Sequence, residues 1–246
     1  MNVPNIIIAL DLDNIEQVEK LLSQLTPQDC ILKIGKALFT AKGPSFVRGL
    51  IDKGFKIFLD LKFHDIPNQV AHAVVEAAKL GVWMVNVHAL GGSNMMRAAQ
   101  QALEAYALEH GHRPLLIAVT ILTSHDLADL LEIGLTGPVE NTVLKLAQLA
   151  KNCGLDGVVC SAQEASLIKA EKNCGKNFIT VTPGIRLETD KSQDQKRIMT
   201  PKAAIELGAN YLVIGRPITG AKDPMAVIQA INQSISVSIS NGNEAL

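Results

Sequence analysis

Short apolar runs rich in isoleucine and valine alternate with longer amphipathic segments along the chain, and this alternation limits the possible folds more than any other feature. Eight strands are predicted at the apolar runs, which cover Ile6–Leu10, Ile31–Ile34, Lys56–Leu61, Val82–His88, Leu115–Thr120, Gly157–Cys160, Asn177–Val181 and Tyr211–Ile214. Eight helices are predicted where apolar positions recur three or four residues apart, over Ile15–Leu25, Pro44–Lys53, Val70–Leu80, Asn94–His110, Val139–Asn152, Ala162–Glu171, Pro201–Leu207 and Pro224–Ser236. Because no hairpin signal joins two strands, the strands are expected to be parallel and connected by helical crossovers.

Eight repeats of one strand and one helix predict an α/β fold, the closed (β/α)8 TIM barrel. An open doubly wound sheet is the alternative, although no GxGxxG sequence follows the first strand, which excludes its dinucleotide-binding version. The length of 246 residues suits one barrel of about 250 residues. We therefore expect a single domain over residues 1–246, with a tail from about residue 234 that loses the pattern and frays.

Composition and charge exclude several classes of function. Hydrophobic residues make up 48% of the chain and charged residues 19%, which excludes intrinsic disorder. The net charge is -1 without a local lysine or arginine cluster, so we expect neither a nucleic-acid partner nor attraction to a membrane surface, whereas a small anionic substrate remains compatible. The four cysteines lack CxxC spacing, and neither a signal peptide nor an apolar run of about 20 residues is present, which predicts a cytoplasmic protein with reduced cysteines.

Ionisable residues are concentrated at three successive predicted strand ends, where parallel barrels carry their active sites. They are Asp11, Lys33, Asp60, Lys62 and Asp65. Because side chains alternate along a strand, Asp60 and Lys62 are expected to point into the barrel mouth while Ile57, Leu59 and Leu61 face the helices.

Spacing alone leaves purely structural roles open for these residues. Asp60, Lys62 and Lys33 could form a structural ion pair at the barrel rim. Asp11 could cap the helix that begins near Asn14.

The run Asp60–Asn68 resembles the DxKxxDIPN signature of the bacterial orotidine 5′-phosphate decarboxylase family. Other segments follow in the order of that family, from residue 6 to about residue 230: Ala9–Asp11, Lys33–Gly35, Val87–Ala89, Leu122–Ser124, Thr182–Arg186, Gln195 and Ile214–Ile218. DxKxxD alone also occurs in other phosphosugar barrels, but the ordered set is specific.

The resemblance implies conversion of orotidine 5′-phosphate to UMP and CO2, the final step of de novo pyrimidine biosynthesis, without a cofactor or metal. It implies a catalytic array of alternating charges made of Lys33, Asp60, Lys62 and Asp65 of the partner subunit, and hence a homodimer that shares the Asp65 region. Lys62 would be the proton donor, since two flanking carboxylates favour its ammonium form.

The resemblance also implies a set of substrate-binding residues, which are Asp11, Lys33, Asp60, Ile66, Asn68, Gln69, Thr123, Arg186, Gln195, Gly215 and Arg216. Phosphate sites of such barrels are built from the loops after strands seven and eight, where Arg186, Gln195, Gly215 and Arg216 lie. The polar segment 184–196 is interpreted as a lid over the mouth. The alternative to a phosphate site is that the glycines only form turns and the arginine is solvated. The alternative for Thr123 is an ordinary loop threonine without a substrate contact.

Some residues depart from the family pattern or stay without a role. Gln69 stands where bacterial members usually have a threonine that contacts the ribose, so here a longer amide side chain would have to make this contact. His64 and His88 lack metal-ligand spacing and are interpreted as hydrogen-bonded rim residues.

Two other functions are compatible with the barrel. The first is a Mg-dependent phosphosugar decarboxylase or aldolase, in which an acidic residue replaces Lys33 because Mg²⁺ needs oxygen ligands. The second is a non-catalytic phosphate-binding barrel, which is disfavoured because a buried array of lysine and aspartate costs stability.

Overall fold

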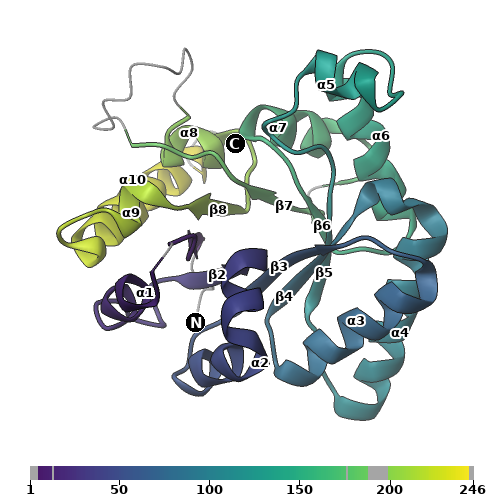
Figure 1. The fold of residues 1–246 in the computed structure, drawn as a ribbon. Coiled ribbons are helices and arrows are strands. Elements are labelled where there is room, and N and C mark those ends of the chain that lie inside the picture. Colours follow the sequence, from purple (N-terminus) through teal and green to yellow (C-terminus); the bar gives the residue numbers. More distant parts are fainter. Residues whose placement is uncertain (1–4, 13, 176, 188–198, 244–246) are drawn as a thin grey trace.

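Eight parallel strands close into a barrel in the order β1 to β8, with β8 paired back to β1, in the computed structural model (Figure 1). The structure describes residues 5–12, 14–175, 177–187 and 199–243. The strands are β1 Ile6–Ala9, β2 Ile31–Gly35, β3 Ile57–Phe63, β4 Met84–His88, β5 Leu115–Val119, β6 Gly157–Val159, β7 Ile179–Thr182 and β8 Tyr211–Ile214. The predicted (β/α)8 barrel is therefore confirmed, and the doubly wound alternative is wrong.

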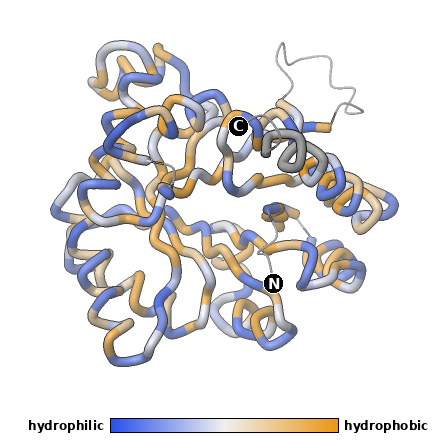
Figure 2. Tube along the Cα trace, turned by 180° about the vertical axis from the view of Figure 1, so that it is seen from behind, coloured by the Kyte–Doolittle hydropathy of each residue, from blue (hydrophilic) through white to orange (hydrophobic). Residues whose placement is uncertain are grey.

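Helices form the outer layer of the barrel (Figure 1). They are α1 Ile15–Leu22, α2 Lys36–Asp52, α3 Pro67–Leu80, the 3-10 turn η1 Ala89–Gly91, α4 Gly92–His110, α5 Leu127–Glu132, α6 Val139–Asn152, α7 Ala162–Ala170, α8 Pro201–Glu206, α9 Arg216–Thr219 and α10 Pro224–Asn243. Their traces alternate between hydrophilic and hydrophobic residues, as expected for helices that cover a sheet with one face (Figure 2).

The helices differ most from the prediction at α2, α5, α9 and α10, and elsewhere the boundaries differ by up to three residues. α2 begins at Lys36 and not at Pro44, because Gly43 adopts a φ of 68° and kinks a longer helix that the sequence pattern divides there. α5 and α9 were not predicted, since six and four residues are too few to show helical periodicity. α10 is helical to Asn243, so a helix occupies most of the tail in which we expected fraying; the first helix-breaking residue there is Gly242.

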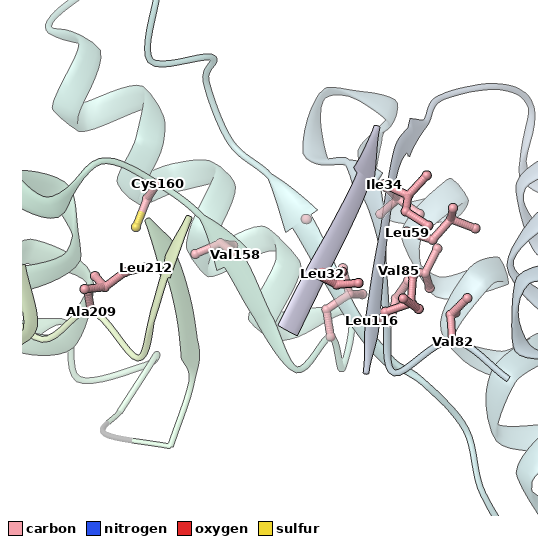
Figure 3. Close-up of a cluster of buried hydrophobic side chains, with 14 of the residues drawn as sticks. Leu32, Ile34, Leu59, Val82, Val85, Leu116, Val158, Cys160, Ala209 and Leu212 are labelled. Carbon is pink, nitrogen blue, oxygen red and sulfur yellow. The ribbon is translucent and has the colours of Figure 1, made fainter. Parts of the chain in front are cut away.

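Two apolar clusters lie on the two sides of the strands. Phe58 packs inside the barrel with Ile7, Ile31 and residues from four other strands. The outward-facing cluster joins the strands to the helices and includes Leu32 and Leu59. Figure 3 shows part of this cluster. The predicted alternation along β3 is therefore correct, and it directs Asp60 to the same side as Phe58.

Two further findings bear on the predicted setting of the protein. None of the helices in the described part of the chain combines the length and the hydropathy that a membrane span requires. All four cysteines are buried and free, as predicted, and burial raises the pKa of the Cys30 thiol to about 12. These thiols are packing residues.

Candidate active site

Four charged side chains form a continuous chain across β1, β2 and β3. The Lys33 ammonium lies between two carboxylates, with its Nζ 3.1 Å from Asp11 Oδ1 and 3.2 Å from Asp60 Oδ2. Lys62 Nζ lies 2.7 Å from the other oxygen of Asp60, Oδ1. Gly35 makes room for this arrangement, because a Cβ there would lie 3.3 Å from Asp11 Oδ1 and 3.5 Å from Lys33 Nζ. The order of charges is therefore negative, positive, negative, positive.

Asp60 is the buried centre of this array. Asp60 and Lys33 are each 7% exposed as whole residues. The Lys62 side chain is 28% exposed and the Asp11 side chain 64% exposed. Burial by itself would raise the pKa of Asp60, but the charges of Lys33 and Lys62, with the hydrogen bonds from Lys62 and Asn86, outweigh it and hold the pKa below its ordinary value. Asp60 is thus a fixed negative charge.

Asn86 is a member of this site that the sequence analysis missed. It lies on β4, is fully buried, and donates from Nδ2 to Asp60 Oδ1 at 2.7 Å. Its Oδ1 accepts the backbone N–H of Lys62 at 2.8 Å. The available signal was an amide side chain within an otherwise apolar predicted strand, where a polar group requires partners.

A cavity of about 500 Å³ opens in front of the array at the carboxyl ends of the strands. It brings together nine of the polar or glycine residues singled out in the sequence: Asp11, Lys33, Asp60, Lys62, Thr123, Gly184, Arg186, Gly215 and Arg216. Its apolar wall includes Ile121, Leu122 and Pro183, which the sequence analysis did not assign. A flat, partly apolar ligand with an anionic end fits such a lining.

Two arginines that line the cavity come after β7 and β8, and β8 is the neighbour of β1 in the closed barrel. Arg186 follows Gly184, whose φ of 82° is readily available only to glycine, and Arg216 is the first residue of α9. At Gly215 a Cβ would meet only Ala9 Cβ at 3.8 Å, so the cavity next to this backbone is open. The two guanidinium groups can donate hydrogen bonds to a phosphate, and the two glycines leave room for it to approach the backbone closely.

The remaining predicted site residues do not line this cavity in the described part of the chain. Asp65 and Ile66 lie between β3 and α3, and Asn68 and Gln69 lie in the first turn of α3. All four are exposed, and Ile66 is 63% exposed. The Asp65 carboxylate accepts the N–H of Ile66 at 2.7 Å. Gln195, and with it residues 188–196 of the predicted lid, lie outside the described residues.

Asp11 does not cap α1, so this alternative is wrong. The N-cap is Asn14, whose side chain accepts the N–H of Glu16 at 2.8 Å. Asp11 instead pairs with Lys33, because it comes two residues after Ala9, the last residue of β1, which is paired with Lys33 of β2.

The histidines at the rim form a stacked pair, His64 and His88, with ring centroids 5.5 Å apart. Burial lowers the pKa of His88 to about 4, and the neighbouring His64 ring and the Lys62 charge add to the effect. His88 also accepts the N–H of Leu90 at 3.4 Å. Within the described residues, no three His, Cys, Asp or Glu side chains are placed to hold a metal ion.

Comparisons with known proteins agree with this geometry. A model of the family described as "Orotidine 5'-phosphate decarboxylase / HUMPS family" matches residues 4–231. A protein of Nitrosococcus oceani named orotidine 5′-phosphate decarboxylase is 56% identical over 96% of this chain and 99% of its own length. One of the same name from Vibrio cholerae serotype O1 is 55% identical over 96% and 100% of the two chains. The crystal structure of orotidine 5′-phosphate decarboxylase from Lactobacillus acidophilus superimposes with a TM-score of 0.83 at 43% identity, covering 95% of this chain and 99% of the other.

Proposed function

The chain belongs to the orotidine 5′-phosphate decarboxylase / HUMPS family and is a carboxy-lyase, and we propose that it converts orotidine 5′-phosphate to UMP and CO2 in the final step of de novo pyrimidine biosynthesis. The observation that carries this proposal is the position of Lys33. Its ammonium lies between Asp11 and Asp60, in the place where a metal-dependent relative would need an oxygen ligand.

Lys62 is the proton donor in this proposal. The substrate carries its carboxylate on carbon C6 of the pyrimidine ring. When the bond between C6 and the carboxylate breaks, its electron pair remains on C6 and CO2 leaves. The Lys62 ammonium, fixed 2.7 Å from Asp60, stabilises the developing negative charge and then gives its proton to C6. No redox step and no electron-sink cofactor is needed for this balance, and we propose that the enzyme works without a cofactor.

Asp60 acts on the leaving carboxylate. Because its pKa is held below the ordinary value, Asp60 is charged when the substrate binds. Two carboxylates close together raise the energy of the bound substrate, and this repulsion disappears as neutral CO2 departs.

The phosphate is held at the ends of β7 and β8 in this proposal. Arg186, Gly215 and Arg216 are the contacts among the described residues, with Gln195 from the lid, and Thr123 faces the pyrimidine edge. Binding energy from this non-reacting end closes the lid and orders the reacting end against Lys62.

Replacing Arg216 by alanine should mainly weaken binding. The loss of a charge-assisted hydrogen bond is worth about 1.5–3 kcal/mol, so KM should rise about 10- to 150-fold, measured by initial rates over a range of substrate concentrations. Arg48→Ala, in an exposed position on α2, is the control and should leave KM unchanged.

Phosphite should partly restore turnover of a phosphate-free substrate by the unmodified enzyme, and absence of this rescue would count against the lid.

The function is tested by following the absorbance of orotidine 5′-phosphate, since removal of the C6 carboxylate alters the chromophore. We expect the absorbance to fall on addition of the protein, at the same rate with and without EDTA. A rate abolished by EDTA would favour the Mg-dependent phosphosugar decarboxylase or aldolase, and absence of turnover would favour the non-catalytic phosphate-binding barrel.

A homodimer is part of the proposal. Asp65, Ile66, Asn68 and Gln69 are exposed and lie away from the cavity of their own chain, although the resemblance places them in the substrate site. A second copy that receives these residues in its own cavity accounts for both facts. Gln69 can still donate to or accept from a ribose hydroxyl across the interface, with a longer reach than threonine.

The organisation of the chain completes the proposal. In this proposal residues 1–246 form one barrel domain, and the enzyme acts in the cytoplasm on a small anionic substrate, with neither nucleic acid nor membrane as a partner.

A further inference from the structure

Asn86 is the fully buried polar side chain that links β4 to the charged array. Its amide makes two hydrogen bonds in opposite senses, donating to Asp60 Oδ1 at 2.7 Å and accepting the Lys62 N–H at 2.8 Å. Asp60 Oδ1 also accepts the Lys62 ammonium at 2.7 Å. One side chain thus contacts both residues to which the reaction is assigned.

The backbone opposite Asn86 is irregular. Leu59 pairs with Val85 and Phe63 pairs with Val87, so residues 60–62 of β3 face a single residue of β4. β3 therefore carries two extra residues in a bulge, and Lys62 has a φ of 52°, in the left-handed region that a lysine seldom adopts. Such a conformation persists only where surrounding groups hold it.

We propose that Asn86 is a positioning residue for the decarboxylation, which holds the Lys62 backbone in its left-handed conformation and the Asp60 carboxylate beneath the Lys62 ammonium. This inference rests on the proposed function. It requires a side chain with one donor and one acceptor at a fixed separation, which asparagine supplies and alanine does not.

Asparagine differs from aspartate at this position in an informative way. A charged carboxylate at residue 86 would accept the Lys62 N–H but would have no proton for Asp60 Oδ1 and would repel it. A protonated carboxyl group of the same shape offers an O–H donor and a carbonyl acceptor, and so restores both hydrogen bonds.

The test compares Asn86→Ala and Asn86→Asp with the unmodified enzyme in the absorbance assay. For Asn86→Ala we expect kcat to fall about 10- to 150-fold, the loss of a hydrogen bond to a charged group, with KM within about threefold because the phosphate contacts lie at the ends of β7 and β8. For Asn86→Asp we expect the ratio of its kcat to that of the unmodified enzyme to rise as the pH falls from about 8 to about 5.

Asn210→Ala is the matched control. Asn210 directly precedes β8 and links it to α7 and β7 through part-buried hydrogen bonds, accepting Lys169 Nζ at 2.8 Å and the Thr180 N–H at 2.9 Å, but at the amino ends of the strands. We expect it to lower the thermal unfolding temperature and to leave kcat unchanged. All rates are measured well below the unfolding temperature of each variant, recorded at each pH.

An unchanged kcat in folded Asn86→Ala would overturn the inference, and so would a ratio for Asn86→Asp that does not change with pH. If Asn86→Ala does not fold, the pH dependence of Asn86→Asp decides, because its side chain has the shape of asparagine. Absence of turnover in the unmodified enzyme would overturn the proposed function as well, which separates the two failures.

Discussion

Lys62→Ala is expected to lower kcat by about 10⁴-fold or more while the protein still folds and binds UMP. A positioned general acid contributes about 10²–10⁴ in rate, and a preorganised charge beside a developing anion contributes about 10²–10³ more. The fold should survive because Asp60 keeps Lys33, at 3.2 Å from Oδ2, and Asn86, at 2.7 Å from Oδ1. The checks are steady-state rates and titration calorimetry with UMP.

Lys56→Ala provides the matched control for this loss. Lys56 directly precedes β3, so it stands at the opposite end of the strand that carries Lys62. Its removal should leave kcat within about twofold, because interactions of exposed or half-exposed lysines rarely exceed about 1 kcal/mol. Turnover by Lys62→Ala close to that of the unmodified enzyme would remove Lys62 from the role of proton donor.

The residues that could be placed from the sequence are those whose direction depends on local geometry alone. Asp60 and Lys62 are two residues apart on one strand, and the alternation of strand side chains predicted that both line the barrel mouth. The bulge that contains Lys62 was not part of this prediction. The barrel could be predicted for a similar reason, since eight repeats of one strand and one helix favour it. The same pattern also permits an open sheet, and the pairing of β8 with β1 excludes that alternative.

Features that depend on contacts between elements could not be placed in this way. The partner of Asp11 had to be found in space, because capping of α1 and pairing with Lys33 fit the same position in the sequence. Asn86 was missed since its role depends on a bulge in β3, the strand beside it. A bulge of this kind leaves no periodic signal, because it inserts residues without changing their character.

The exposed segment after β3 marks a third limit. Nothing in the spacing of Asp65, Ile66, Asn68 and Gln69 shows that they serve another subunit, and the fold of one chain leaves them at the surface. Only the resemblance assigns them to a site. An experiment on two inactive variants can test this assignment without knowledge of the interface.

We expect an equal mixture of Lys62→Ala and Asp65→Asn proteins, after exchange of subunits, to recover about a quarter of the unmodified activity, although each variant alone is nearly inactive. Random exchange makes half of the dimers mixed. In each mixed dimer one site lacks both residues, while the other combines Lys62 of one subunit with Asp65 of its partner and is intact. Half of the sites in half of the dimers gives one quarter, measured as the initial rate per total subunit.

A mixture of Lys62→Ala with Asp60→Asn distinguishes a shared site from any general effect of mixing. Lys62 and Asp60 lie 2.7 Å apart in one chain, so every site of this mixed dimer lacks one of them and no activity should return. Recovery in the first mixture and not in the second requires that Asp65 crosses the interface. If neither mixture recovers after tagged subunits have been shown to exchange, each chain uses its own Asp65, and the segment 65–69 must then move toward its own cavity when the substrate binds.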